Sequence, residues 1–507
     1  MRLRLHILAG LVLGSLALTL VAEEHSKLWP AADAALRDRL PDFSFAGYQR
    51  GEKAIPEVAV TANVRDFGAK GDGVTDDTAA FKAAIEKTAA GAILIPEGRY
   101  LLTDILDIRK PNIVLRGVGP TKTTLFFTKE LEEVRTNMGA TTAGRPTSNY
   151  SWSGGFVWAR GSYGSKDLAT ITQPARRGAM MVAVSTTDGL AIGQTIEIEQ
   201  RDEPTNTLAA HLYAGQPDDT AKLLGKTHAS LTARITAMDA AAKTIRIDRA
   251  LRFDIESRWT PKVLRFEPTV TGVGIESLRF EFPQTPYMGH FTERGRNAIA
   301  FTQVADCWVR DVAIDDCDSG IFARGRYCTF SDIVLRSGRT PDAALKCTGH
   351  HGFEFDDDDN LLTRFRFETR FVHDICVCRC AGNVTSSGFG VDLCLDHHKY
   401  APYANLFTDL DAGAGTRLWR CGGGAKLGKH SGADETFWNI RAAKAQSWPP
   451  KDFGPDRMNL VGLTTDQPAE MSAEGKWFEP ISPKELSPQN LHAGQVEKRV
   501  GKKAGER

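Results

Sequence analysis

The sequence predicts an all-β protein whose short strands form stacked coils. Short apolar runs rich in Val, Ile and Phe, separated by turn residues, follow one another from Gly272 onwards. Comparable phrases, such as DCWVRDVAIDD and YCTFSDIVLRS, recur about every 20 to 30 residues. One coil of that length cannot bury its apolar face alone, so repeated coils are expected to stack on one another.

Composition narrows the classes of protein that fit. Of the 507 residues, 42% are apolar and 25% are charged, which is typical of a globular chain and argues against a disordered or multi-span membrane protein. Lys and Arg together number 63, and so do Asp and Glu. Because there is no basic excess, the sequence does not indicate a nucleic-acid partner.

The first 22 residues are typical of a secretory signal. Arg2 and Arg4 precede an uncharged apolar stretch over residues 7–22, which ends at two glutamates. This stretch is short for a membrane span, which needs ~20 apolar residues. We therefore expect residues 1–22 to be a signal peptide, and the mature protein to be secreted or periplasmic without a membrane span. A retained N-terminal anchor is the alternative.

A series of short elements follows a polar lead-in over residues 23–60. Residues 64–67 can form a short strand, and the glycine-rich segment 68–73 must turn. Thr75 or Asp76 supplies an N-cap for a helix with an apolar face at helical spacing. That face consists of Ala80, Phe81, Ala84 and Ile85.

These elements carry a resemblance to a known family. VRDFGAKGDGVTDDTAAFKAAIE, followed by ILIPEGRYLL and NIVLRGVG, closely resembles the entry segment of the pectate-lyase-like superfamily. The resemblance implies a single-stranded right-handed parallel β-helix, with an N-terminal helix that caps the first coil. Lyases, glycoside hydrolases, epimerases and phage tail spikes share this fold, so the resemblance implies a carbohydrate-active protein without fixing its reaction.

The pattern of expected strands divides the chain into further segments. Residues 61–175 are expected to form the N-terminal part of the β-helix, and residues 269–480 its C-terminal part with the active groove. Between them, residues 176–268 alternate apolar and polar side chains, which predicts a small inserted antiparallel β-domain. Residues 481–507 are polar, and we expect a frayed tail there.

The cysteines do not form an obvious disulfide framework. All nine lie between Cys307 and Cys421, and their number is odd. Cys376, Cys378 and Cys380 alternate, so on a strand they would share one face. Zinc knuckles require a different spacing, and we therefore favour buried thiols over a zinc site.

The positions of the histidines give the main indication of a catalytic site. Six of twelve lie between residues 350 and 430, and the steps from His350 to His373 and from His373 to His397 are 23 and 24 residues. If each step is one coil, these imidazoles occupy adjacent rungs ~4.8 Å apart. Imidazoles and carboxylates gathered on one groove suit proton transfer. The predicted catalytic residues are His373, Asp374, Asp392, Asp396, His397 and His398; the alternative is a chance spacing of histidines that cap turns.

Other polar residues nearby are candidates for binding. An anionic sugar would need positive charge and stacking surfaces, and the predicted substrate-binding residues are His350, His351, Lys399, Arg417, Trp419, Arg420 and His430. The dense acidic segment supplies Glu354, Asp356 and Asp358 as candidate ligands for calcium. A solvated acidic turn is the alternative, and no cofactor other than this calcium is expected.

Three functions remain open from the sequence. The first is a polysaccharide lyase that cleaves a uronate-containing polymer by β-elimination, with His373, His397 or His398 as the base and Arg417, Lys399 or a cation neutralising the carboxylate. The second is a polygalacturonase-like glycoside hydrolase with paired aspartates. The third is a non-catalytic carbohydrate-binding β-helix.

Overall fold

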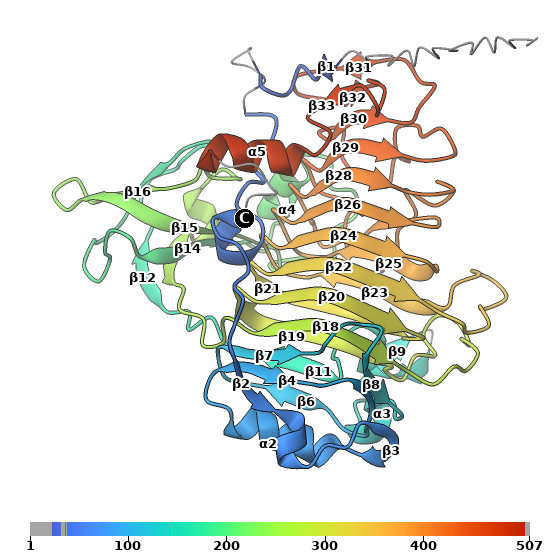
Figure 1. Cartoon of the computed structure of the whole chain (residues 1–507). Coiled ribbons are helices and arrows are strands. Elements are labelled where there is room, and N and C mark those ends of the chain that lie inside the picture. The colour runs from blue at the N-terminus through green and yellow to red at the C-terminus, as the bar shows by residue number, and fades with distance from the viewer. Residues whose placement is uncertain (1–22, 32–35, 37, 143, 502–507) are drawn as a thin grey trace, which may run out of the picture.

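The protein folds as a parallel β-helix, as predicted. The structure is a computed structural model that describes residues 23–31, 36, 38–142 and 144–501, so the expected signal peptide lies outside the described residues. Figure 1 shows the strands stacked as successive coils along one axis, with a separate β-domain projecting from one side. None of the helices in the described ranges is long and apolar enough to cross a membrane.

Two parallel sheets run along the helix. The longer sheet contains β2 (Val60–Asn63), β4 (Gly91–Leu94), β7 (Ile113–Arg116), β18 (Gly274–Glu281), β20 (Trp308–Asp315), β22 (Thr329–Arg336), β24 (Leu361–Phe367), β26 (Val384–Gly390), β28 (Leu406–Asp411), β29 (Thr436–Arg441), β30 (Asn459–Leu463) and β32 (Trp477–Glu479). Near its ends it also takes in β3 (Asp72–Asp76), β5 (Gly98–Leu102), β8 (Thr123–Phe127) and the antiparallel β31 (Glu470–Met471). The second sheet contains β6 (Leu106–Ile108), β11 (Val157–Arg160), β19 (Asn297–Ala305), β21 (Ser319–Arg326), β23 (Gly349–Phe355), β25 (Phe371–Val377) and β27 (Leu395–His397).

The core consists of columns of apolar side chains, one from each rung. In the second sheet a single column passes through paired positions on all seven strands: Leu106, Val157, Ile299, Ile321, Phe353, Ile375 and Leu395. All of them are buried. Full burial of such a side chain contributes about 1.5–3 kcal/mol, so each added coil gains stability mainly through its contact with the preceding one.

The entry segment caps the first coil. Helix α2 (Thr78–Lys87) buries the predicted face of Ala80, Phe81, Ala84 and Ile85. Its N-cap is Asp77 and not Thr75 or Asp76, and the Asp77 carboxylate accepts hydrogen bonds from the backbone N–H groups of Lys70 and Gly71. The strand predicted over 64–67 is wrong: Val64–Phe67 is a 3-10 helix, because the Asn63 side chain caps it by accepting from Arg65 N.

The inserted domain is a six-stranded antiparallel sheet with its own core. Its strands are β12 (Asp167–Thr170), β17 (Lys262–Arg265), β14 (Thr195–Arg201), β15 (His228–Asp239), β16 (Thr244–Ile247) and β13 (Met181–Ala183), in that order, with the short helix α4 (Thr207–Leu212). The insertion therefore begins before residue 176. Its core packs against Ala381, Ala401 and Tyr403 of the β-helix.

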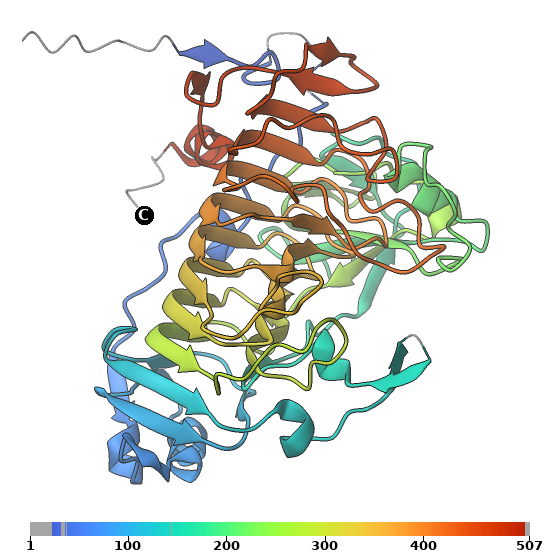
Figure 2. The ribbon, with the colours of Figure 1, turned by 90° about the vertical axis from the view of Figure 1, so that its right-hand side faces the viewer.

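The remaining short elements lie in connections and near the two ends. Antiparallel β9 (Ala140–Thr142) and β10 (Arg145–Thr147) form a hairpin beside α3 (Leu131–Val134) (Figure 2). Strand β1 (Glu24–His25) pairs in parallel with β33 (Leu486–Ser487), so the start of the described chain is paired close to its end. Further 3-10 helices span Tyr48–Gly51, Asn149–Ser151 and Ser257–Trp259.

The prediction of a frayed tail after residue 480 is wrong. Helix α5 (Leu491–Val500) lies across the lead-in segment (Figure 1), and its residues Leu491 and Val496 are buried. The Gln495 side chain accepts from Phe43 N and donates to Pro41 O. The helix is ordered because it packs on the lead-in, a contact between distant segments that local polarity does not reveal.

Replacement of Leu491 by Ala tests this docking. We expect the free energy of unfolding to fall by about 2–5 kcal/mol, because a fully buried leucine leaves a cavity. Urea unfolding followed by tryptophan fluorescence measures the change. Leu224→Ala, at a side chain that is 52% exposed, is the matched control and should change stability by about 0.5 kcal/mol at most. Equal effects of the two substitutions would show that α5 does not support the fold.

Candidate active site

Five histidines gather on the outer surface of the second sheet. His350 and His351 lie on β23, His373 on β25, His398 just after β27, and His290 in the loop between β18 and β19. The ring centroids are 4.9 Å apart for His351 and His373, 5.0 Å for His373 and His398, and 4.6 Å for His290 and His350. These five residues are called the histidine cluster below.

Strand register explains most of the cluster. His351 pairs directly with His373, one coil apart, and Phe353 pairs with Ile375 two residues further along the same strands. On the next rung Cys376 pairs with Asp396. The predicted column of imidazoles and carboxylates from successive coils is therefore present, although with a different register from the one expected.

Asp396 is the centre of the arrangement. Its Oδ2 lies 2.8 Å from Nδ1 of His373 and 2.7 Å from Nδ1 of His398, and its Oδ1 accepts from Gly422 N at 2.7 Å. Burial raises the pKa of the Asp396 carboxyl, but the two imidazoles outweigh burial and hold that pKa well below its usual range. Burial lowers the pKa of His398, but the Asp396 carboxylate outweighs it and raises that pKa above its ordinary value. The carboxylate therefore stays ionised and favours a proton on the His398 imidazole.

Several buried polar atoms of the cluster have no hydrogen-bond partner in the described part of the chain. They are Nε2 of His373, Nδ1 of His350, Nδ1 of His351 and Oε2 of Glu293. Burial raises the pKa of Glu293 to about 7, and burial together with the neighbouring imidazoles lowers the pKa of His290 to about 4. Unpaired polar atoms in a buried site are costly, so these atoms require a partner other than the described residues, such as water or a ligand.

The prediction that His397 belongs to the exposed column is wrong. Its ring is fully buried against Phe407, Phe437 and Phe453, and its Nδ1 lies 3.0 Å from Leu395 O. His397 pairs with Val377 on the inward-facing side of the sheet. His398 occupies the outward position instead, because adjacent residues of a strand point to opposite faces.

Asp374 and Asp392 are held by other partners. Asp374 accepts from the backbone N–H groups of Phe371 and Cys394 and forms an ion pair with Arg417. Asp392 accepts from Thr416 through both its N–H and its hydroxyl. Their lone pairs are occupied, so the structure does not support a proton-transfer role for either carboxylate, and Arg417 is committed to Asp374.

The other predicted substrate-binding residues lie at the margin of the cluster. Lys399, Arg420 and His430 are half-buried, and Lys399 directly follows His398. Trp419 packs edge-on against Phe437 and Phe453, and its indole N–H donates to Ser447 O. Lys399 and Arg420 therefore remain available to an anionic ligand, whereas Trp419 is largely used in packing.

The calcium site predicted at Glu354, Asp356 and Asp358 is not supported. Glu354 pairs with Arg324, and Asp356 pairs with Arg379. Asp358 accepts from Ser230 and from the Ala381 N–H. Among the described residues, no group suited to metal binding contains Asp356 or Asp358. Arginines neutralise Glu354 and Asp356, and hydrogen-bond donors occupy Asp358, so a cation would have to displace these partners.

Two residues of the site were not predicted. His290 and Glu293 come from the segment YMGHFTERG, which contains no periodic pattern and lies far from the other histidines in sequence. The only available signal was a histidine beside acidic and aromatic residues in a long loop. The cysteines follow the prediction: all nine are free, and eight are buried.

Comparison with known proteins agrees with the fold. The family described as rhamnogalacturonase A/epimerase, pectate lyase-like, matches residues 61–154. The tailspike protein gp49 from Pseudomonas phage LKA1 has a similar structure, with a TM-score of 0.51 at 15% identity over 80% of this chain and 64% of the tailspike. The entry segment therefore matches this pectate-lyase-like family, and the chain as a whole has the parallel β-helix fold.

The sequence relatives of this β-helix protein match only a short part of it. Alginate lyase 7 from Azotobacter vinelandii is 36% identical over 97 residues, which are 17% of this chain and 11% of the lyase. The mannuronan C5-epimerase AlgE4 from the same organism is 34% identical over 97 residues, 17% of this chain and 18% of the epimerase. The chain thus matches less than a fifth of the length of these relatives.

Substitution of Arg417 tests whether it supports the fold of this β-helix protein or binds substrate. Arg417→Met should lower the free energy of unfolding by about 3–5 kcal/mol, because it leaves the buried Asp374 carboxylate without its counter-charge. Arg364→Met removes an exposed pair with Asp332 and should cost about 1 kcal/mol or less. Unfolding in urea measures both. Unchanged stability in Arg417→Met would show that Arg417 does not support the fold and would again make it a candidate for substrate binding.

Proposed function

We propose that the protein is a polysaccharide lyase that cleaves a uronate-containing polysaccharide by β-elimination, with His398 as the base. The observation that carries this proposal is the Asp396 carboxylate, which is bonded to Nδ1 of His398 and lies equally close to Nδ1 of His373. Export of the enzyme, as the N-terminal sequence predicts, would bring it to an extracellular polymer.

The geometry around His398 suits a general base. Asp396 holds the Nδ1–H, so Nε2 of His398 carries the lone pair that accepts a proton. The His398 side chain is 29% exposed, whereas that of His373 is 5% exposed, so His398 is the one that a polymer reaches. In the reaction, Nε2 removes the proton beside the uronate carboxylate, and a carbon–carbon double bond forms as the bond to the glycosidic oxygen breaks. The leaving oxygen takes up a proton from water and becomes a hydroxyl group. Asp396 stabilises the resulting imidazolium.

A hydrolytic mechanism fits the carboxylates less well. Inverting and retaining glycosidases require one carboxyl group that holds a proton and a second that is free to act as base or nucleophile. Asp396 is ionised by its histidine neighbours, while Asp374 and Asp392 are occupied by arginine and backbone donors. A purely binding protein would not need an imidazole held by a buried carboxylate.

The names of the sequence relatives support a uronate as substrate. Alginate lyase 7 and the mannuronan C5-epimerase AlgE4 each match 97 residues of this chain, and neither match extends over the whole β-helix. They therefore support the class of polymer and not the roles of particular residues. Lys399 and Arg420, half-buried at the margin of the cluster, are the candidate partners for the uronate carboxylate.

Substrate assays with a His398 variant test the proposal. Alginate, polygalacturonate and a neutral glucan are incubated with the protein, and unsaturated ends are measured by ultraviolet absorbance. We expect absorbance with a uronate polymer, and His398→Gln should lower kcat by about 10²–10⁴-fold because the base is lost. His25→Gln, an exposed histidine on β1, is the control and should retain activity.

The same assay in D₂O separates the other reactions. New reducing ends without ultraviolet absorbance would mean hydrolysis and would contradict the proposal. Deuterium gained beside the carboxylate without chain cleavage would mean epimerisation, which shares the proton abstraction but lacks the elimination, and would also contradict a lyase. Full activity in His398→Gln would remove His398 as the base.

A further inference from the structure

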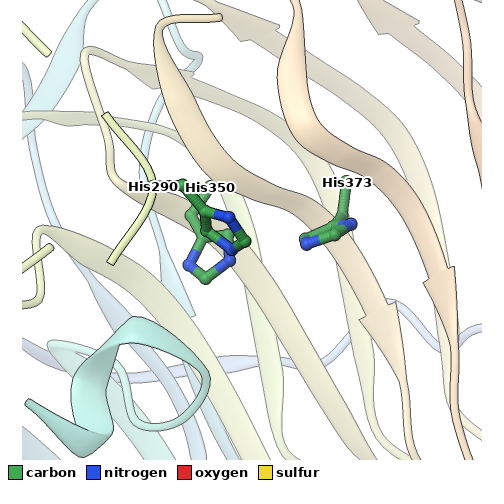
Figure 3. Close-up of side chains that lie close together, drawn as sticks. All are labelled: His290, His350 and His373. Carbon is green, nitrogen blue, oxygen red and sulfur yellow. The ribbon is translucent and has the colours of Figure 1, made fainter. Parts of the chain in front are cut away.

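Three imidazoles of the histidine cluster face one another in a way that the base at His398 does not explain. They belong to His290, His350 and His373, and one nitrogen from each lies within 4.8 Å of the others (Figure 3). They come from the β18–β19 loop, β23 and β25, so three separate segments of the chain converge there.

The ring nitrogens of these three histidines lie in a surrounding that is unusual for histidines with a purely structural role. His350 and His373 are 2% and 4% exposed, and Nε2 of His373 has no hydrogen-bond partner among the described residues. A buried polar atom without a partner costs about 1–3 kcal/mol. In addition, neighbouring imidazoles repel one another when protonated, so their proximity gains nothing from charge. A bound cation would satisfy the free nitrogens.

Carboxylates behind two of the rings add a second, independent observation. Asp396 lies 2.8 Å from Nδ1 of His373, and Glu293 lies 3.6 Å from Nδ1 of His350. Histidines that bind metal through one ring nitrogen almost always direct the other at a carboxylate, a carbonyl or water, which fixes the ring and raises its basicity. His373 has this arrangement, with Nε2 as the free nitrogen.

We propose that His290, His350 and His373 bind a divalent first-row transition metal, best satisfied by Zn²⁺. Imidazole ligands favour this class over calcium, which prefers oxygen. Three protein ligands leave a fourth coordination position open, as in catalytic zinc sites. His290 is half-buried on a loop, and it is the ligand with the most freedom to adjust its position.

Two neighbouring groups of residues are weaker candidates for the same metal. The group His373, Asp396 and His398 shares His373, but Asp396 already has Nδ1 of both imidazoles beside it. In the group His351, Glu354 and Cys376, the Glu354 carboxylate is paired with Arg324. Binding at either group would require existing ion pairs or hydrogen bonds to break.

A metal bound at this site would have a role in catalysis, and this role rests on the proposed lyase function. β-Elimination requires the uronate carboxylate to be neutralised. Arg417 is committed to Asp374, so a metal here would share this role with Lys399 and Arg420. The ring of His373 is 5.0 Å from that of His398, so a metal on His373 would lie next to the base. A carboxylate in the open coordination position would present its neighbouring proton to His398.

Metal binding is tested separately from activity. The full-length protein is stripped with a chelator, and binding of Zn²⁺ is measured by calorimetry, with Co²⁺ absorbance as a report on coordination by nitrogen. We expect one equivalent of metal and a rise in Tm on binding. His290→Gln and His350→Gln should each weaken binding at least 100-fold. His290→Gln changes a half-buried loop residue, so it keeps the test valid if His350→Gln fails to fold.

Matched variants locate the metal and separate the two proposals. His398→Gln and Cys376→Ser should bind Zn²⁺ as the unmodified protein does, and loss of binding in either would overturn this assignment. Absence of stoichiometric binding to the unmodified protein would also overturn it. Metal binding without turnover of any polymer would refute the lyase and leave the metal site standing, whereas full turnover by the metal-free protein would refute the metal's role in neutralising the carboxylate.

Discussion

In-register parallel pairing between successive coils is the constraint on which both the core and the site depend. On one face of the second sheet, pairing aligns the apolar column that ends at Ile375 and Leu395. The same pairing places His351 beside His373 and Cys376 beside Asp396. A shift of one residue would separate these pairs and turn the apolar column outward. The free energy that holds the core together therefore also fixes the geometry of the cluster.

Charge neutralisation decides which acidic residues remain available for chemistry. At the junction with the inserted domain, Asp359 lies between Arg249 and Arg252, and Arg326 bridges Glu197 and Asp357. Arginine stays protonated at all working pH values, so such pairs are permanent and structural. Asp396 differs because its counter-charges are imidazoles, which gain and lose protons near neutral pH. Among the carboxylates predicted to be catalytic, it is the one whose partners can take part in proton transfer.

Features that depend on interactions local in sequence, or on the repeat of coil length, could be predicted, whereas features that depend on long-range contacts could not. The entry helix and its apolar face were predictable because helical spacing and turns are local in sequence. His373, His398 and Asp396 were predictable because coil length repeats. His397 was misplaced because a count of residues per coil leaves an uncertainty of one position, and one position reverses the face of a strand. Long-range contacts stayed hidden: the loop that carries His290, and the docking of α5 on the lead-in, depend on partners far away in sequence.

Gly422 shows how far the site is organised around one carboxylate. Its N–H donates to Oδ1 of Asp396, and a Cβ at this residue would lie 2.6 Å from Cε1 of His373 and 2.7 Å from Cε1 of His398. Only glycine allows the backbone to approach both rings so closely. Asp396 thus has donors on both oxygens, and its position is fixed before any ligand arrives. The same carboxylate oxygen lies at hydrogen-bond distance from Nδ1 of both imidazoles, which directs Nε2 of each ring away from it. This preorganisation is the feature that proton abstraction by His398 and metal binding by His373 would both require.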